Sequence, residues 1–325
     1  SLMASALLWL LASFVVSAAL FPPFIRFLRE SGVLTFHWLR PDADNPTFFN
    51  LHQKKIGTPS MGGAVMVAVI AVATPFVLSG PTLLAFHVAL IPLALLGLAD
   101  DVTKVLVRSG RLTRDMAARP KLVAQWLTGL GVAGILYLNG VQSVRVPFGL
   151  SLDLGIIYVL AAAFVVAASA NAVNIADGLD GLAGGLLVIA LSAFMVLATI
   201  QQRYDLMAIS AVMTGAILGF LAFNIHPAKV FMGDIGSLAL GGTLGTLALL
   251  LDHWVPFAII AGVLVVETLS SLIQTIALRR GRRVFRIAPL HHHFEAIGWP
   301  EARITPIFWL AGALLAYLGI LVALL

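Results

Sequence analysis

The sequence has no cysteine and little charge, since Asp, Glu, Lys and Arg make up only 11% of its 325 residues. A chain without cysteine forms no disulfide, offers no thiolate to a metal ion and has no cysteine nucleophile. Apolar residues are abundant instead, at 60%, and the mean hydropathy is +1.01. Repeated apolar runs of about 20 residues match a helix that crosses about 30 Å of hydrocarbon. The composition therefore excludes a soluble domain and predicts a polytopic membrane protein.

Ten apolar runs predict ten transmembrane helices. The expected spans are residues 2–28, 59–78, 82–99, 122–138, 154–170, 182–200, 206–223, 237–251, 255–278 and 304–325. The first run has no basic segment before it and leads into further spans, so we interpret it as a helix and not as a cleaved signal peptide. Residues 141–153 alternate apolar and polar side chains, which predicts a short extracytoplasmic hairpin. We expect one all-helical integral membrane domain, residues 1–325.

The basic residues predict how these helices are oriented. The odd-numbered connections, counted along the chain, hold 18 of the 20 lysines and arginines when Arg26 at the end of the first span is included, and the other connections hold only Arg145 and Arg203. Basic residues beside short loops stay in the cytoplasm, so the odd connections are expected inside and both termini outside. We interpret the run from Arg279 to Arg286 as an anchor to anionic lipid headgroups, with a contact to substrate phosphate as the alternative.

The few carboxylates gather in three segments at the ends of apolar runs, residues 99–104, 171–181 and 231–237. An ionisable side chain near a bilayer costs several kcal/mol unless it is paired, hydrated or bound to a metal, so each segment is a candidate functional site. The helix count places all three segments on the cytoplasmic face. We therefore expect one acidic site there, and its hard oxygen ligands favour Mg²⁺ or Mn²⁺ over zinc.

Two of these segments carry carboxylates beside expected helix ends. Asp100 and Asp101 are expected at the end of the third span, where the helix dipole and their mutual repulsion require a cation such as Lys104 or a metal ion. Adjacent helical residues point about 100° apart, so the two can face different ligands. Asp234 lies between glycines, and we expect the next helix to open at Gly236 with amides available to a phosphate.

The remaining segment spaces four polar residues by three: Asn171, Asn174, Asp177 and Asp180. On a continuous helix this stripe rotates by about 60° per step, so the interleaved glycines favour a turn whose polar groups converge on a nucleotide or sugar.

Two further polar features lie near the end of the chain. Residues 291–293 are consecutive histidines on the same expected face, where imidazoles can hold phosphate oxygens or move protons. Glu267, inside the ninth span, is interpreted as a structural hydrogen-bonding group, with a role as a site ligand as the alternative.

These motifs, in this order, resemble one family of bacterial membrane enzymes. They are residues 55–63, 100–104, 171–185, 231–242 and 289–295. Their arrangement over essentially the whole chain is similar to that of the phospho-N-acetylmuramoyl-pentapeptide transferases, in the polyprenyl-phosphate N-acetylhexosamine-1-phosphate transferase superfamily. The His-His-His-Phe-Glu form of residues 291–295 resembles this branch and not the related N-acetylglucosamine-1-phosphate transferases.

The resemblance implies a multi-pass enzyme of the bacterial cytoplasmic membrane. Its expected reaction moves phospho-MurNAc-pentapeptide from UDP to undecaprenyl phosphate, which gives lipid I and UMP for peptidoglycan synthesis, with Mg²⁺ required. The implied partners are UDP-MurNAc-pentapeptide, undecaprenyl phosphate, membrane lipids and a second copy of the chain in a homodimer; nucleic acid is not among them.

The resemblance also implies roles for individual residues. Asp234 is expected to bind Mg²⁺, Asp100 to deprotonate the lipid phosphate, and Phe231 to stack on uracil. The implied catalytic residues are Asp100, Asp101, Asp234, His291 and His292. The implied substrate-binding residues are Lys55, Ser60, Lys104, Lys121, Asn171, Asn174, Asp177, Asp180, Asn224, Phe231 and His293. Attack by the lipid phosphate, directly or through a covalent aspartyl intermediate, is compatible with this set.

Two other functions are alternatives. A sister phosphoglycosyl transferase uses a different UDP-sugar, and the histidine segment and an acceptor assay distinguish it. A cation-coupled transporter places its acidic residues near the middle of the bilayer, whereas here they are expected at one face.

Overall fold

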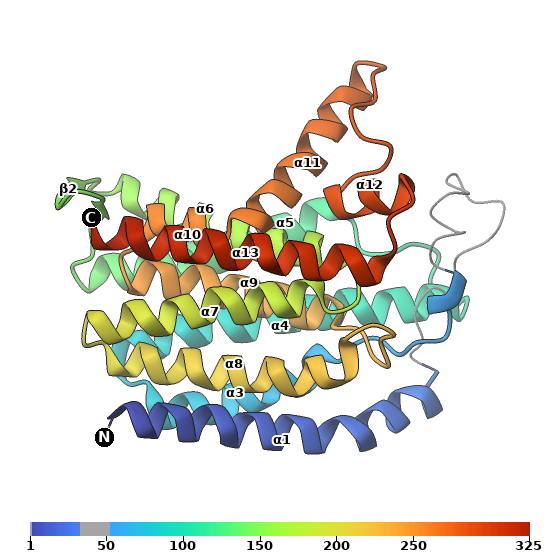
Figure 1. Cartoon of the computed structure of the whole chain (residues 1–325), viewed down its shortest axis with the longest axis horizontal. Helices are drawn as coiled ribbons and strands as arrows, with labels where there is room; N and C mark the ends of the chain where they lie inside the picture. Colours follow the sequence, from blue (N-terminus) through green and yellow to red (C-terminus); the bar gives the residue numbers. More distant parts are fainter. Residues whose placement is uncertain (1, 33–52) are drawn as a thin grey trace.

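A computed structural model describes residues 2–32 and 53–325 of the chain, which form a bundle of long helices with one small hairpin (Figure 1). The elements are α1 (Leu2–Glu30), η1 (Gln53–Lys55), α3 (Gly63–Val77), α4 (Gly80–Arg108), α5 (Ala118–Leu138), β1 (Ser143–Val146), β2 (Leu150–Asp153), α6 (Ile157–Ala176), α7 (Leu182–Ile200), α8 (Tyr204–Asn224), α9 (Gly233–Leu250), α10 (Trp254–Ile260), α11 (Gly262–Arg279), α12 (Leu290–Ala296) and α13 (Glu301–Leu324). Most of the predicted connection after the first span lies outside the described residues.

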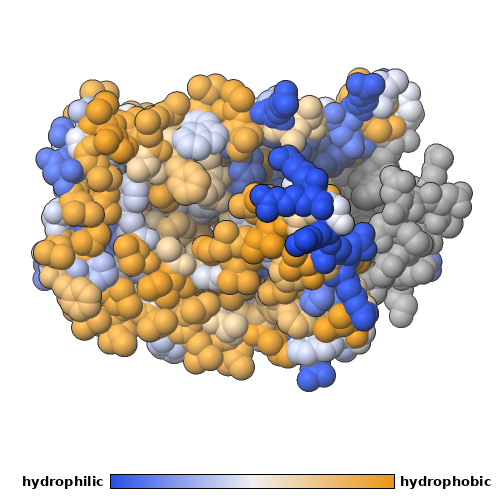
Figure 2. All heavy atoms as spheres, turned by 90° about the horizontal axis from the view of Figure 1, so that it is seen from above, coloured by the Kyte–Doolittle hydropathy of each residue, from blue (hydrophilic) through white to orange (hydrophobic). Residues whose placement is uncertain are grey.

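The prediction of an all-helical membrane protein is confirmed. Within the described residues, nine helices are long and apolar enough to cross a membrane, and α3, with 15 residues, is a shorter apolar helix. Figure 2 shows a surface that is mostly hydrophobic, with hydrophilic side chains concentrated towards one end of the molecule. The two ends of the chain lie at the same end of the bundle in Figure 1, on opposite sides of it in this view, and the hairpin is at that end too.

The ninth predicted span, residues 255–278, is wrong as a single helix. The chain forms the short α10 and then α11, which meet at Ala261. A Cβ on Gly262 would lie 2.8 Å from the Leu315 side chain of α13, so the chain approaches α13 closely at this break. α10 stays beside α13, whereas α11 leans out of the bundle (Figure 1). The apolar pattern runs through both helices, so hydropathy alone did not reveal the break.

The hairpin prediction for residues 141–153 is confirmed as a local structure. β1 and β2 pair antiparallel, with Ser143 opposite Asp153 and Val146 opposite Leu150. The backbone N–H of Arg145 donates to Asp252 Oδ1 at 3.0 Å, which ties the hairpin to the connection between α9 and α10.

α9 lies at the centre of the bundle, and its residues Ile235–Leu249 are all buried. Glycines let its neighbours approach its N-terminal end. A Cβ on Gly97 of α4 would lie 2.2 Å from the carbonyl oxygen of Asp234, and one on Gly63 of α3 would lie 2.3 Å from the backbone of Gly236. This close packing brings the predicted acidic segments of α4 and α9 together.

Candidate active site

The carboxylate cluster consists of Asp100, Asp101 and Asp234 with the lysines Lys104 and Lys121. Lys104 Nζ lies 2.9 Å from Asp100 Oδ2, 3.0 Å from Asp234 Oδ2 and 3.8 Å from Asp101 Oδ1. Lys121, at the start of α5, reaches Asp100 Oδ2 at 3.0 Å and Asp234 Oδ2 at 4.0 Å. Three carboxyl groups therefore share two lysines, which leaves an excess of negative charge when all are ionised.

Asp100 and Asp101 have different surroundings, as their adjacent positions on a helix predict. Asp100 is fully buried, and within the described part of the chain no group donates a hydrogen bond to its Oδ1. Asp101 Oδ2 instead accepts the backbone N–H of Ile235 at 3.1 Å, in the first turn of α9. Gly233, with φ of +75°, makes this approach possible, because a Cβ there would lie 2.7 Å from Asp101 Oδ2.

Two expectations about these helix ends are wrong. Asp100 and Asp101 do not end their helix, since α4 continues to Arg108 and Lys104 pairs with Asp100 one turn later. The next helix opens at Gly233 and not at Gly236, so Asp234 lies in its first turn. α4 ends later than its apolar run, and α9 begins earlier than its apolar run. Ion pairs at this end of the bundle stabilise the additional polar turns of both helices.

The predicted glycine-rich turn begins later than expected. Asn171 and Asn174 are helical, on the last turns of α6, and only residues 177–181 form the turn before α7. Asn174 Nδ2 donates to Asp234 Oδ1 at 3.0 Å and to Ser237 Oγ at 2.8 Å, so it joins the carboxylate cluster. Asn171 donates to the Gln125 side chain of α5 and to the Ala167 carbonyl, so it is directed elsewhere.

Residues of the 177–181 turn interact with the carboxylate cluster, with His291 and with the group of side chains around Lys55. Burial, together with the negative charges of Asp234 and Asp101, raises the pKa of Asp177 to about 7. A Cβ on Gly178 would lie 2.3 Å from His291 Nε2, so this imidazole rests against the turn. Asp180, at the other side of the turn, belongs to a network of its own.

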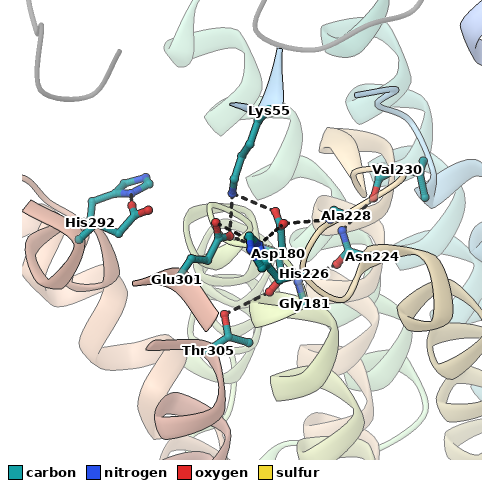
Figure 3. Close-up of polar contacts among 11 residues, drawn as sticks. Lys55, Asp180, Gly181, Asn224, His226, Ala228, Val230, His292, Glu301 and Thr305 are labelled. Atoms are coloured by element: carbon teal, nitrogen blue, oxygen red, sulfur yellow. Dashed lines mark hydrogen bonds and ion pairs between the residues drawn. The ribbon is translucent and has the colours of Figure 1, made fainter. Parts of the chain in front are cut away.

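The lysine network consists of Lys55, Asp180, His226 and Glu301 (Figure 3). Lys55 Nζ lies 2.9 Å from Asp180 Oδ1 and 2.7 Å from Glu301 Oε1. Asp180 Oδ2 accepts from His226 Nδ1 at 2.9 Å and from the Ala228 backbone at 3.0 Å. Glu301 Oε1 also accepts the backbone N–H of Asp180. These contacts join η1, the 177–181 turn, the connection after α8 and the start of α13.

Lys55 and Asp180 stabilise each other's charge. Burial alone lowers the pKa of Lys55, but the carboxylates of Glu301 and Asp180 outweigh it and raise that pKa above its usual value. Burial alone raises the pKa of Asp180, and the Lys55 ammonium reverses the effect and holds that pKa below its usual value. Both groups are therefore charged at neutral pH.

Phe231 and Asn224, two other predicted nucleotide contacts, lie beside the lysine network. Lys55 Nζ is 5.6 Å from the centroid of the Phe231 ring. Asn224 Oδ1 accepts the N–H of Gly181 at 2.9 Å, and its Nδ2 donates to the Val230 carbonyl at 2.9 Å. Asn224 thus holds the turn against the segment that carries Phe231.

The first motif packs against the motif that contains Asp234. The N–H of Phe231 donates to the Pro59 carbonyl at 2.8 Å, and the N–H of Gly62 donates to the Phe231 carbonyl at 2.8 Å. Ser60 lies beside Gly233, where a Cβ would meet its Oγ at 3.1 Å. The backbone of the first motif, residues 55–63, therefore connects the lysine network with the carboxylate cluster.

The histidine pair, His291 and His292, lies on α12 and is oriented by two carboxyl groups. His291 and Glu267 are both fully buried, with His291 Nδ1 at 2.9 Å from Glu267 Oε2 and the His291 backbone N–H at 3.2 Å from Oε1. His292 Nδ1 lies 2.6 Å from Glu295 Oε2. Burial and the neighbouring His291 lower the pKa of His292 to about 4, so this ring is neutral at pH 7.

His293 is directed away from this pair. Its Nδ1 accepts the backbone N–H of Arg286 at 3.1 Å, and the Arg286 guanidinium donates to the Ala296 carbonyl at 3.0 Å. The third histidine therefore fastens the basic connection between α11 and α12.

Sequence reasoning missed the roles of His226 and Glu301 in this geometry. Glu267, a carboxyl group inside an apolar span, was interpreted as a structural hydrogen-bonding group, and the structure gives it a specific partner in His291. Glu301 carried no such signal, because acidic residues are common in the first turn of any helix.

One set of described side chains has the geometry of a metal site. The ligand atoms of Asp180, His226 and Glu301 all lie within 4.8 Å of one another. The ammonium of Lys55 already contacts both carboxylates of this set, so a cationic group is present among them.

The long apolar helices define a multi-pass membrane protein. Its class is that of the glycosyl transferases, because residues 83–252 match the family described as glycosyl transferase family 4. A phospho-N-acetylmuramoyl-pentapeptide-transferase of Bacillus subtilis (strain 168) is 41% identical over 320 residues, covering 96% of this chain and 95% of the relative. The enzyme of the same name from Geobacillus sp. (strain WCH70) is 42% identical over 321 residues, with coverage of 96% and 95%. The chain belongs to the phospho-N-acetylmuramoyl-pentapeptide-transferase family.

Proposed function

We propose that this protein transfers phospho-N-acetylmuramoyl-pentapeptide from UDP-MurNAc-pentapeptide to undecaprenyl phosphate. The products are lipid I, for peptidoglycan synthesis, and UMP. The observation that carries the proposal is the carboxylate cluster with its two lysines, at the N-terminal end of α9, in a chain that matches its relatives over nearly its full length. Such a site has both a proton acceptor and cationic groups for phosphate oxygens.

The acceptor phosphate is assigned to Asp100, Lys104 and Lys121. Asp100 takes the proton from the lipid phosphate, and the lysines hold its other oxygens. The deprotonated oxygen forms a bond to the β-phosphorus of the donor, and the bond from that phosphorus to the bridging oxygen breaks, so that UMP leaves with the bridging oxygen. Asp101 holds the first turn of α9 through the Ile235 N–H and so keeps Asp234 beside Asp100.

Mg²⁺ is the metal we assign to this reaction, with Mn²⁺ as an alternative, held by Asp234. The residues fit a hard cation, because the cluster offers carboxylate oxygens in excess of its lysines and includes the buried Asp100 Oδ1, to which no described residue donates a hydrogen bond. When bound, the metal neutralises charge on the diphosphate and on the departing UMP. Asn174 holds the Asp234 carboxylate in place through Oδ1.

The donor nucleotide is assigned to Phe231, Lys55 and Asp180. The Phe231 ring offers a stacking face for uracil, and the charged Lys55 and Asp180 offer one hydrogen-bond donor and one acceptor beside it. His291 is fixed by Glu267, and its Nε2 faces Gly178 in the 177–181 turn, where it can exchange a proton with the transferred group.

The membrane arrangement is also proposed. The active site faces the cytoplasm, both termini lie outside, and the whole chain is one integral domain of the bacterial cytoplasmic membrane. The lysine and arginine distribution and the grouping of both ends of the chain at one end of the bundle support this arrangement. A homodimer is proposed on family resemblance. A monomer mass in native mass spectrometry from mild detergent would contradict the homodimer.

The direct test uses purified protein in detergent with UDP-MurNAc-pentapeptide, undecaprenyl phosphate and Mg²⁺. We expect lipid I by mass spectrometry and an equal amount of UMP. Replacement of MurNAc-pentapeptide by N-acetylglucosamine in the donor should give no lipid product. The absence of lipid I with the muramoyl donor, or an equal rate with both donors, would contradict the proposal.

A further inference from the structure

Glu301 is a buried carboxyl group that closes the lysine network from α13, 246 positions after Lys55. Its side chain is 9% exposed. Oε1 accepts from Lys55 Nζ at 2.7 Å and from the Asp180 backbone N–H, and Oε2 lies 3.7 Å from His226 Nδ1. Thr305, one turn later on α13, donates to the Asp180 carbonyl at 3.1 Å. The start of α13 is therefore fastened to both the N–H and the carbonyl of Asp180 in the 177–181 turn (Figure 3).

The charge of Glu301 is unexpected in a site for an anionic donor. Lys55 already has Asp180 as a counter-ion, so an ionised Glu301 makes the set of Lys55 and two carboxylates negative overall. A further negative charge repels a diphosphate, and burial of a carboxylate has a cost of its own. The side chain therefore needs a function that outweighs these two penalties.

Preorganisation supplies such a function. A free lysine side chain has many rotamers, and a ligand that fixes a mobile ammonium group must overcome this entropy. Glu301 and Asp180 hold Lys55 Nζ from two directions before any nucleotide arrives. The Asp180 N–H bond fixes the turn at the same time, so the donor meets a pocket that is already ordered.

We infer that Glu301 is a positioning residue of the donor-nucleotide site, which holds Lys55 and the 177–181 turn in the geometry that receives the nucleotide. The inference rests on the proposed function and adds a residue to it. Glu301 acts through Lys55 and Asp180, because its two carboxylate oxygens face Lys55, the Asp180 backbone and His226.

The decisive variant is Glu301→Gln, which keeps the shape and one oxygen acceptor but removes the charge. We expect the KM for UDP-MurNAc-pentapeptide to rise about tenfold, because an ordered Lys55 contributes to ground-state and transition-state binding alike. kcat and the KM for undecaprenyl phosphate should stay within about twofold, because the carboxylate cluster is untouched. If Glu301 acted only as a repulsive charge, its removal would lower the donor KM, and that result would overturn the inference.

A double-mutant cycle tests whether Glu301 acts through Lys55. In a Lys55→Gln background, Glu301→Gln should raise the donor KM by less than about twofold, because the group that it positions is already gone. Full additivity of the two effects would show that Glu301 works by another route. Glu301→Asp keeps the charge but is shorter, so we expect an intermediate rise of about threefold.

Two controls separate this inference from folding and from the proposed function. Glu30→Gln makes the same chemical change at an exposed residue of α1 and should leave both KM values unchanged. Calorimetric binding of UMP, measured without acceptor, should weaken about tenfold in Glu301→Gln at unchanged thermal stability. Wild-type protein that binds UMP but makes no lipid I defeats the proposed function alone, whereas equal UMP binding by wild type and Glu301→Gln defeats the inference alone.

Discussion

The carboxylate cluster and the lysine network lie at the same end of the bundle but are built differently. In the cluster, Lys104 and Lys121 are 33% and 25% exposed, and three carboxyl groups crowd around them. In the network, Lys55, Asp180 and Glu301 are all at most 9% exposed and bind one another. The lysines of the cluster are accessible and its carboxyl groups outnumber them, which suits a metal ion and a reacting phosphate. The three ion-paired side chains of the network are buried, and only His226, at 45%, is exposed, which suits a rigid wall of a binding site.

This difference predicts that perturbations of the two regions change different kinetic constants. Changes in the cluster should lower kcat, because its groups act on the reacting phosphates. Changes in the network should raise the donor KM, because its groups hold the nucleotide.

Metal removal should have the largest effect and should act on the cluster. EDTA is expected to reduce lipid I formation to background, since the charge on the diphosphate is then uncompensated. Mg²⁺ or Mn²⁺ should restore the rate, and Zn²⁺ should not, because the ligands are hard oxygens. UMP release followed by chromatography measures this effect. Full activity in excess EDTA would show that the reaction needs no metal ion.

Asp100→Asn should lower kcat by about 10²–10³, because the proton acceptor for the lipid phosphate is lost. The donor KM should change by less than about threefold, since the lysine network is intact. Asp115→Asn is the matched control at an exposed position and should match the wild type. A raised donor KM with normal kcat in Asp100→Asn would show that Asp100 acts in nucleotide binding and not as the proton acceptor.

Glu267→Gln should lower kcat by about tenfold, because the amide no longer fixes His291 with a proton on Nδ1. In a His291→Gln background the same change should have almost no further effect. Steady-state rates of the two single variants and the double variant measure the coupling. Independent effects of Glu267 and His291 would return Glu267 to a purely structural role.

The smallest effect is expected from exposed charges outside both regions. Replacement of Arg282 and Arg283 by glutamine should leave kcat and the donor KM in detergent within about twofold, since we interpret them as lipid anchors. Native mass spectrometry should show fewer retained anionic lipids. A large rise in the donor KM would instead assign this basic run to substrate phosphate.

The two regions also differ in how well the sequence predicted them. The cluster was anticipated because each of its carboxylates interrupts an apolar run, where an ionisable group is costly. Its helical context was not anticipated, because ion pairs extend α4 and α9 beyond the apolar residues that define a span. The helix break at Ala261 was missed for a related reason, since hydropathy does not register where two apolar helices meet.

The lysine network was only half anticipated. Lys55 and Asp180 lie in recognisable motifs, whereas His226 and Glu301 join them through tertiary packing. Glu301 lies 246 positions after Lys55, and an acidic residue after Pro300 at a helix start has an ordinary local explanation. No local pattern distinguishes a helix-stabilising glutamate from one that pairs with a distant lysine.

One pair of variants tests most directly whether the carboxylate cluster determines kcat and the lysine network determines the donor KM. The measurement is kcat and the donor KM of Asp234→Asn and of Lys55→Gln in the same lipid I assay. We predict that Asp234→Asn lowers kcat by about 10³ with little change in the donor KM, and that Lys55→Gln raises the donor KM by at least about tenfold with kcat nearly unchanged. The reverse assignment, or equal effects of both variants on both constants, would contradict the account.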